Sequence, residues 1–106
     1  MSSWQPFDHG QTIGMKSPEG GVIVRDEEHL LGARITLKEA REYISISCNI
    51  SGRIDHSRFF RNMSDAQREY DVMKDELVRV AKVSSSARFG DIKSWDAIAA
   101  FVSKFQ

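Results

Sequence analysis

Residues 32–60, GARITLKEAREYISISCNISGRIDHSRFF, carry the most regular hydrophobic pattern in the chain. From Ile44 to Ile50 every second side chain is apolar, and the side chains between them are polar. Because successive side chains of a strand point to opposite faces of a sheet, this alternation predicts a strand with one buried face and one wet face. Residues 33–39 alternate in the same way and predict a neighbouring strand.

Further strands are predicted on both sides of this pair. Residues 53–60 follow the turn signal Ser51-Gly52, which favours a hairpin. An earlier strand is expected over residues 22–26, and the polar residues 26–29 are expected to lie in the loop after it, with a helical turn over residues 27–31 as the alternative. Residues 11–16 are a candidate for a short edge strand.

Helical periodicity replaces alternation after this region. The sequence Ser64-Asp65-Ala66-Gln67 has the form of a capping box, in which a hydroxyl residue is followed three positions later by Gln. Apolar residues then recur at steps of three and four, which predicts a helix over residues 64–82. Strands followed by helices predict an α+β fold: an antiparallel β-meander of three to five strands with one face covered by a long helix, plus a C-terminal helix.

The ends of the chain are expected to be simpler. Residues 1–19 predict an irregular arm that two aromatic side chains pin to the body or to a partner subunit. Three consecutive serines, Ser84 to Ser86, predict a linker over residues 83–90. A second helix then begins near Asp91 or Ser94 and runs to residue 106.

Length and charge set the class of protein. The chain has 106 residues, enough for one domain with a modest core. Its 15 Lys and Arg residues balance 15 Asp and Glu residues, which argues against a nucleic-acid partner and is compatible with self-association. Without a long apolar run or a basic leader, we expect a soluble cytoplasmic protein with no membrane partner. The one cysteine, Cys48, is expected to be a buried free thiol.

The wet face of the predicted sheet is the first candidate for function. Cations, hydroxyls and one aromatic side chain gather on it: Arg25, Arg34, Thr36, Lys38, Tyr43, Ser45, Ser47 and Asn49. Such a surface suits an acidic protein segment or a small anion, while plain solvation and back-to-back packing in a dimer are the alternatives. The hypothesis that we favour is a small non-catalytic module that binds a protein partner.

The C-terminal helix is the second candidate surface. Its large apolar side chains form one broad stripe: Trp95, Ile98, Phe101, Val102 and Phe105. The helix is expected either to pack beside the first helix or to reach a second copy of the chain. The second arrangement would make the protein a homodimer.

The chain contains no catalytic, phosphate-binding or zinc-binding motif, and nothing in it predicts a metal or another cofactor. His56 and Asp55 are weak catalytic candidates, because His56 shares a strand face with Ile54 and Arg58 at the end of the sheet. The alternative hypothesis is therefore a small enzyme or ligand-binding domain with a pocket near His56, which His29 or Arg58 would help to line. A backbone hydrogen bond to His56 is the simpler interpretation.

Overall fold

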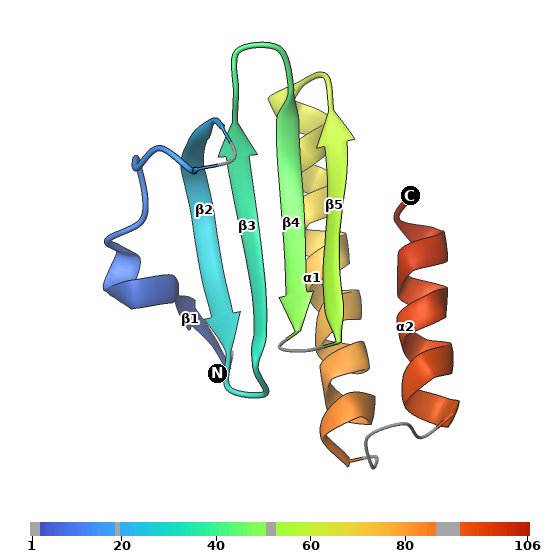
Figure 1. Ribbon diagram of the computed structural model, residues 1–106. Coiled ribbons are helices and arrows are strands. Elements are labelled where there is room, and N and C mark those ends of the chain that lie inside the picture. The colour runs from blue at the N-terminus through green and yellow to red at the C-terminus, as the bar shows by residue number, and fades with distance from the viewer. Residues whose placement is uncertain (1–2, 19, 51–52, 87–91) are drawn as a thin grey trace.

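The computed structural model describes residues 3–18, 20–50, 53–86 and 92–106. Its strands form one antiparallel sheet in chain order: β1 (Trp4–Pro6), β2 (Val22–His29), β3 (Ala33–Glu39), β4 (Ile44–Ile50) and β5 (Ile54–Phe60). A short helical segment, η1 (Phe7–Gly10), follows β1, and the two long helices are α1 (Met63–Ser86) and α2 (Ile92–Lys104). Helix α1 crosses one face of the sheet, and α2 lies beside α1 beyond β5 (Figure 1). The predicted α+β fold is confirmed.

The core lies between the sheet and α1. Ile35, Leu37 and Ile46 point from the strands toward the helix, where Tyr70 and Leu77 meet them, and all five side chains are fully buried. These are the alternating strand positions and the helical stripe that the sequence pattern predicts. Removing apolar surface from water contributes roughly 25 cal/mol per Å², so this contact is the main source of stability.

Cys48 belongs to the same core, as predicted. It is a free thiol with no solvent exposure, and burial raises its pKa to about 12. Because the thiolate is the reactive form of cysteine, this group acts as a small apolar side chain rather than as a nucleophile.

Strand β2 is longer than predicted, and the loop expected over residues 26–29 is wrong. The chain stays extended to His29, and only residues 30–32 connect β2 to β3. The polar residues remain in the strand because both faces of the sheet supply partners for their carboxylates. Asp26 bonds Arg34 on one face, and Glu27 bonds Lys74 of α1 on the other.

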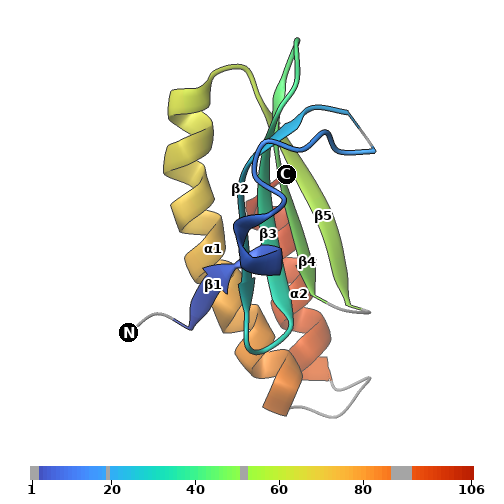
Figure 2. The same ribbon diagram turned by 90° about the vertical axis from the view of Figure 1, so that its left-hand side faces the viewer.

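The N-terminal arm is joined to the edge of the sheet, but not through a strand over residues 11–16. The edge strand is β1, which pairs with the C-terminal half of β2. Gly14 adopts a positive φ angle of 85°, which turns the chain inside the segment that was expected to be extended. Backbone hydrogen bonds then connect Gly14 and Met15 to Ile23. This loop lies on the side of the sheet opposite α1 (Figure 2).

The start of α1 differs from the predicted capping box. Asn62 caps the helix, because its Oδ1 accepts a hydrogen bond from the backbone N–H of Asp65 at 2.8 Å. Ser64 is therefore inside the first turn rather than at the cap.

The end of α1 extends into the predicted linker. Ser84 is helical and buried, and its Oγ lies 3.2 Å from the Oγ of Ser94 in α2. Its carbonyl oxygen accepts a hydrogen bond from Arg53 at 2.6 Å, so both contacts hold this turn in place. The predicted turn at Ser51-Gly52, the remainder of the linker and a helix start at Asp91 lie outside the described residues.

Candidate functional site

The face of the sheet opposite α1, called the open face below, carries most of the predicted binding residues. Cross-strand pairing places its side chains in three rows: Ile23, Lys38, Ser45 and Phe59; Asp26, Thr36, Ser47 and Ser57; and Glu28, Arg34, Asn49 and Asp55. All the binding residues predicted on β3 and β4 lie in these rows. Tyr43, just before β4, joins the first row through an edge-to-face contact with Phe59 at 5.4 Å between ring centroids.

Arg25 is not on the open face, which corrects the prediction. The register between β2 and β3 shifts between Ile23 and Arg25, so Val24 is an extra residue in the strand. Such a bulge changes which face the following side chains take. The Arg25 guanidinium instead lies 4.0 Å above the Tyr70 ring, on the helix side, and pairs with Glu27 at 3.2 Å.

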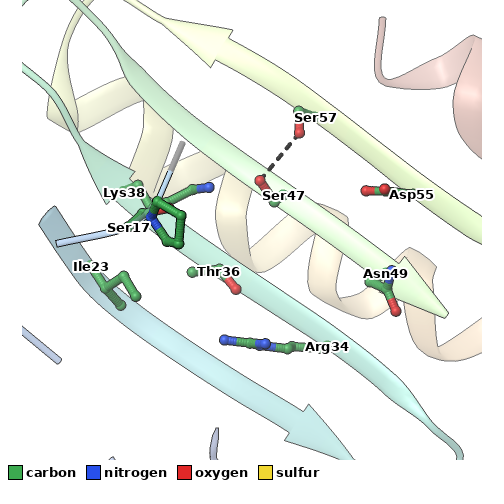
Figure 3. A pocket seen from close by; sticks show the side chains of 10 residues that line it. Ser17, Ile23, Arg34, Thr36, Lys38, Ser47, Asn49, Asp55 and Ser57 are labelled. Atoms are coloured by element: carbon green, nitrogen blue, oxygen red, sulfur yellow. Dashed lines mark hydrogen bonds between the residues drawn. The ribbon is translucent and has the colours of Figure 1, made fainter. Parts of the chain in front are cut away.

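A hollow of about 390 Å³ occupies the middle of the open face. This central hollow is lined from β2, β3, β4, β5 and the loop before β2 by Ser17, Pro18, Ile23, Arg34, Thr36, Lys38, Ser47, Asn49, Asp55 and Ser57 (Figure 3). Thr36 and Lys38 are buried although they belong to the polar face. The prediction of a wet face therefore holds only in part, because the loop with Ser17 and Pro18 lies over it.

A buried carboxylate network fixes the β2 side of the central hollow. The Asp26 side chain has no exposed surface and accepts hydrogen bonds from Arg34, Thr36 and Thr12. The Arg34 guanidinium also lies 3.5 Å above the ring of Phe7. The hollow is thus built on a preformed arrangement in which Arg34 has little freedom to move.

A second, smaller hollow of about 100 Å³ adjoins the first and is called the side hollow. It shares Lys38, Ser47 and Ser57 with the central hollow, and Tyr43 and Phe59 form its apolar side. The Oγ atoms of Ser47 and Ser57 lie 3.2 Å apart, within hydrogen-bonding distance, between the two hollows.

The charges of the open face are mixed rather than cationic. Two cations, Arg34 and Lys38, share its rows with the carboxylates of Asp26, Glu28 and Asp55. Asp26 already neutralises Arg34 through a bidentate pair. Selection of an acidic segment, expected when only cations and hydroxyls were assigned to this face, therefore loses its electrostatic basis.

The residues proposed for a pocket near His56 do not come together. His56 Nε2 lies 2.7 Å from the carbonyl oxygen of Phe105, which is the simple backbone contact predicted for it. Asp55 points to the opposite face, and Arg58 pairs with Glu69 of α1 at 2.9 Å.

His29 is also far from this proposed pocket, at the β1 edge of the sheet. Its ring meets Trp4 edge-to-face at 5.1 Å. Burial and nearby Lys82 lower the pKa of His29. Within the described ranges, no three His, Cys, Asp or Glu side chains are placed to hold a metal ion.

Helix α2 takes the first of its two predicted arrangements and packs beside α1. Phe101 and Phe105 are 3% and 2% exposed, and Ile98 and Val102 are partly buried against the same core. Trp95 is about half exposed at the start of the helix. The two phenylalanines are thus core residues of the single chain and are not accessible to a second copy.

Several lining residues were not assigned to the site from the sequence. Asp55 and Ser57 were recognisable, because alternation puts them on the strand face opposite His56 and pairing with β4 brings that face beside Ser47. Asp26, which does not line the hollow but holds Arg34 in place beside it, could not be singled out because it lies in a run of polar residues. Nothing local in the sequence indicates that Ser17 and Pro18 reach the same hollow.

The lining of the two hollows offers hydrogen-bonding groups and charged side chains. No described histidine or cysteine lines either hollow on the open face, so the serine hydroxyls there have no such base beside them. No helix among the described residues is long and apolar enough to cross a membrane. No family model matches the chain, and the searches of curated proteins and of solved structures found no significant match.

Proposed function

We propose that this chain is a small, non-catalytic interaction module that binds a segment of a partner protein on its open face. The central hollow is the observation that carries the proposal. Its volume falls in the range of about 300–1,000 Å³ that is usual for small-molecule pockets, so it has room for side chains of a bound segment. Four hydrogen-bonded strands supply most of its lining, so the polar groups are held in place before a partner arrives.

The composition of the face supports recognition rather than simple solvation. Phe59 is 64% exposed, and the polar groups of the central hollow begin directly beside it. Apolar contact area next to fixed hydrogen-bonding groups is the usual arrangement at protein recognition sites. A cytoplasmic location is part of this proposal.

A homodimer is a separate prediction with less support than the helical stripe first suggested. Phe101 and Phe105 are buried inside the chain, and the large apolar side chains that α2 still exposes are Ile92 and Trp95, near its beginning. Light scattering on the full chain at high concentration tests this prediction. A monomeric mass would contradict the predicted homodimer and would leave the proposed binding face unaffected.

The binding face is tested with two matched arginine substitutions. Ser57→Arg places a long side chain in the central hollow, whereas Gln67→Arg places the same side chain on an exposed turn of α1. Each protein is immobilised, and the proteins that it retains from the native cell extract are compared. We expect that wild type and Gln67→Arg retain one or more partner proteins that Ser57→Arg does not retain. The thermal melting curves of the three proteins should be the same.

Two results would contradict the proposal. One is a set of partners that all three proteins retain equally, which would place binding elsewhere on the molecule. The other is retention no greater than that of an unrelated immobilised protein of the same size.

A further inference from the structure

We infer that the bound segment places an apolar side chain on Tyr43 and Phe59 and a basic side chain beside Asp55, four residues along. This inference rests on the proposed function and adds the chemistry of the occupant. It follows from a difference between the two ends of the open face along β5: the end at Phe59 is apolar, and the end at Asp55 is acidic.

The spacing of the two ends is set by β5. Phe59 and Asp55 are four residues apart on this strand, and both point to the open face. At about 3.3 Å per residue their positions are separated by roughly 13 Å. Side chains i and i+4 of an extended segment lie on one side with the same repeat, so a segment running along β5 reaches both ends.

The first end has an apolar surface. Phe59 is 64% exposed and Tyr43 is 38% exposed, and their rings meet at the rim of the side hollow. Lys38 lies in the same row as Phe59. An apolar side chain of the bound segment would cover these two exposed rings.

The second end is acidic. Asp55 is exposed and stands opposite Asn49, and Glu28 and Arg34 complete its row. Arg34 is held by Asp26, so its charge is already balanced, and Asp55 supplies the exposed carboxylate at this end of the hollow. Figure 3 shows Asp55 across the hollow from Lys38. The contrast between the apolar rings at the first end and the Asp55 carboxylate at the second selects a basic side chain here and fixes the direction of the segment.

Short synthetic peptides test the inference without knowledge of the partner. The probe is acetyl-Ser-Leu-Ser-Ser-Ser-Lys-Ser-amide, with its apolar and basic residues four positions apart. Matched peptides replace the Lys by Glu or the Leu by Ser. Binding is followed at low salt by the amide chemical shifts of the ¹⁵N-labelled protein during titration.

A charge reversal in the protein provides the decisive comparison. Asp55→Lys should lower the affinity for the Lys peptide roughly two- to fivefold. It should raise the affinity for the Glu peptide by a similar factor, as expected for an exposed ion pair. Asp75→Lys, the same change at an exposed position of α1, should leave the order of the peptides unchanged. Phe59→Ser should weaken both Leu-containing peptides about tenfold, whereas Val72→Ser on α1 should not.

The inference is wrong if the Lys and Glu peptides bind Asp55→Lys in the same order as they bind wild type. It is also wrong if no peptide shifts the amides of Ser47 and Ser57 at millimolar concentration. Open-face shifts that depend on protein concentration alone would show a second copy as the occupant and would overturn it too. If Ser57→Arg still loses partners in any of these cases, the proposed function stands and only this chemistry fails.

Discussion

Arg34 holds the carboxylate of Asp26 through two parallel hydrogen bonds, at 2.9 Å from Nε and 2.7 Å from Nη2. The same carboxylate accepts hydrogen bonds from Thr36 at 3.0 Å and from Thr12 at 2.8 Å. One acidic side chain of β2 therefore fixes β3 and the N-terminal arm together, beneath the hollow that we propose as the binding site.

Glu27, the next residue, forms similar hydrogen bonds on the other face of the strand. Glu27 accepts a hydrogen bond from the Tyr70 hydroxyl at 3.0 Å and from Lys74 at 2.6 Å, which joins β2 to α1. Adjacent carboxylates thus attach different parts of the chain to opposite faces of β2, because successive side chains of a strand alternate.

Replacing Asp26 by Asn should destabilise the protein. The neutral amide cannot form the charge-assisted pair with Arg34, and hydrogen bonds to charged groups contribute about 1.5–3 kcal/mol each. We expect a loss of about that size in the free energy of unfolding, measured by urea denaturation. Glu28→Gln, on the same strand but outside this network, is the control and should change the unfolding free energy by about 0.5 kcal/mol or less. Equal losses in the two variants would contradict the role assigned to Asp26.

The ionisation of Glu27 should make the free energy of unfolding depend on pH in the acid range. Burial alone would raise the pKa of Glu27, but hydrogen bonds from Lys74 and Tyr70 and the nearby positive charges outweigh burial and lower it below its ordinary value of 4.5. A lowered folded-state pKa gives stabilisation that is complete above the unfolded-state value and is lost as the pH falls through the folded-state value.

The comparison with Glu27→Gln isolates this effect. Wild type should be the more stable protein at neutral pH, and the difference in unfolding free energy should shrink as the pH falls below 4.5. Urea denaturation at several pH values measures it. A difference that stayed constant down to the acid limit would show that the Glu27 charge does not contribute.

The alternating segments could be predicted because they report local burial. In β3 and β4 every apolar residue faces α1, so Ile35 and Ile46 were assigned to the core from pattern alone. The open face followed from the same alternation, which is why Ser47 and Asn49 were found. Local alternation fails at Val24, where a bulge without a glycine reverses the face of Arg25.

Contacts between distant segments account for the rest of what the sequence did not reveal. Asp26 and Glu27 look like loop residues, because their partners Thr12 and Lys74 lie far away in the chain. Similarly, the apolar stripe of α2 is compatible with a contact inside the chain or between two chains. Periodicity shows that a face is buried but not what covers it.

Leu77→Asp should prevent folding. Leu77 is fully buried between α1 and the sheet, so the substitution would place an unpaired charge in the core. We expect the cooperative thermal melt to disappear. Val72→Asp, on the exposed side of the same helix, should retain it. An unchanged melt for Leu77→Asp would refute the packing of α1 on the sheet.

Helix α2 should stabilise the single chain rather than an assembly. Phe101 is buried against the core, and Phe105 lies beside it with ring centroids 4.9 Å apart. Phe101→Ala should therefore cost about 3–5 kcal/mol in unfolding free energy, as for other buried phenylalanines. Ile92→Ala, at the 73% exposed beginning of α2, should cost far less.

Solution mass separates this role from dimer formation. If α2 acts within one chain, a chain ending at Ser86 should unfold or melt at much lower temperature, because the removed phenylalanines leave the core open. The loss should be the same at low and high protein concentration, since a monomer has no concentration-dependent stability. A full chain that is dimeric by light scattering, with a truncated chain that is a stable monomer, would instead make α2 the assembly surface.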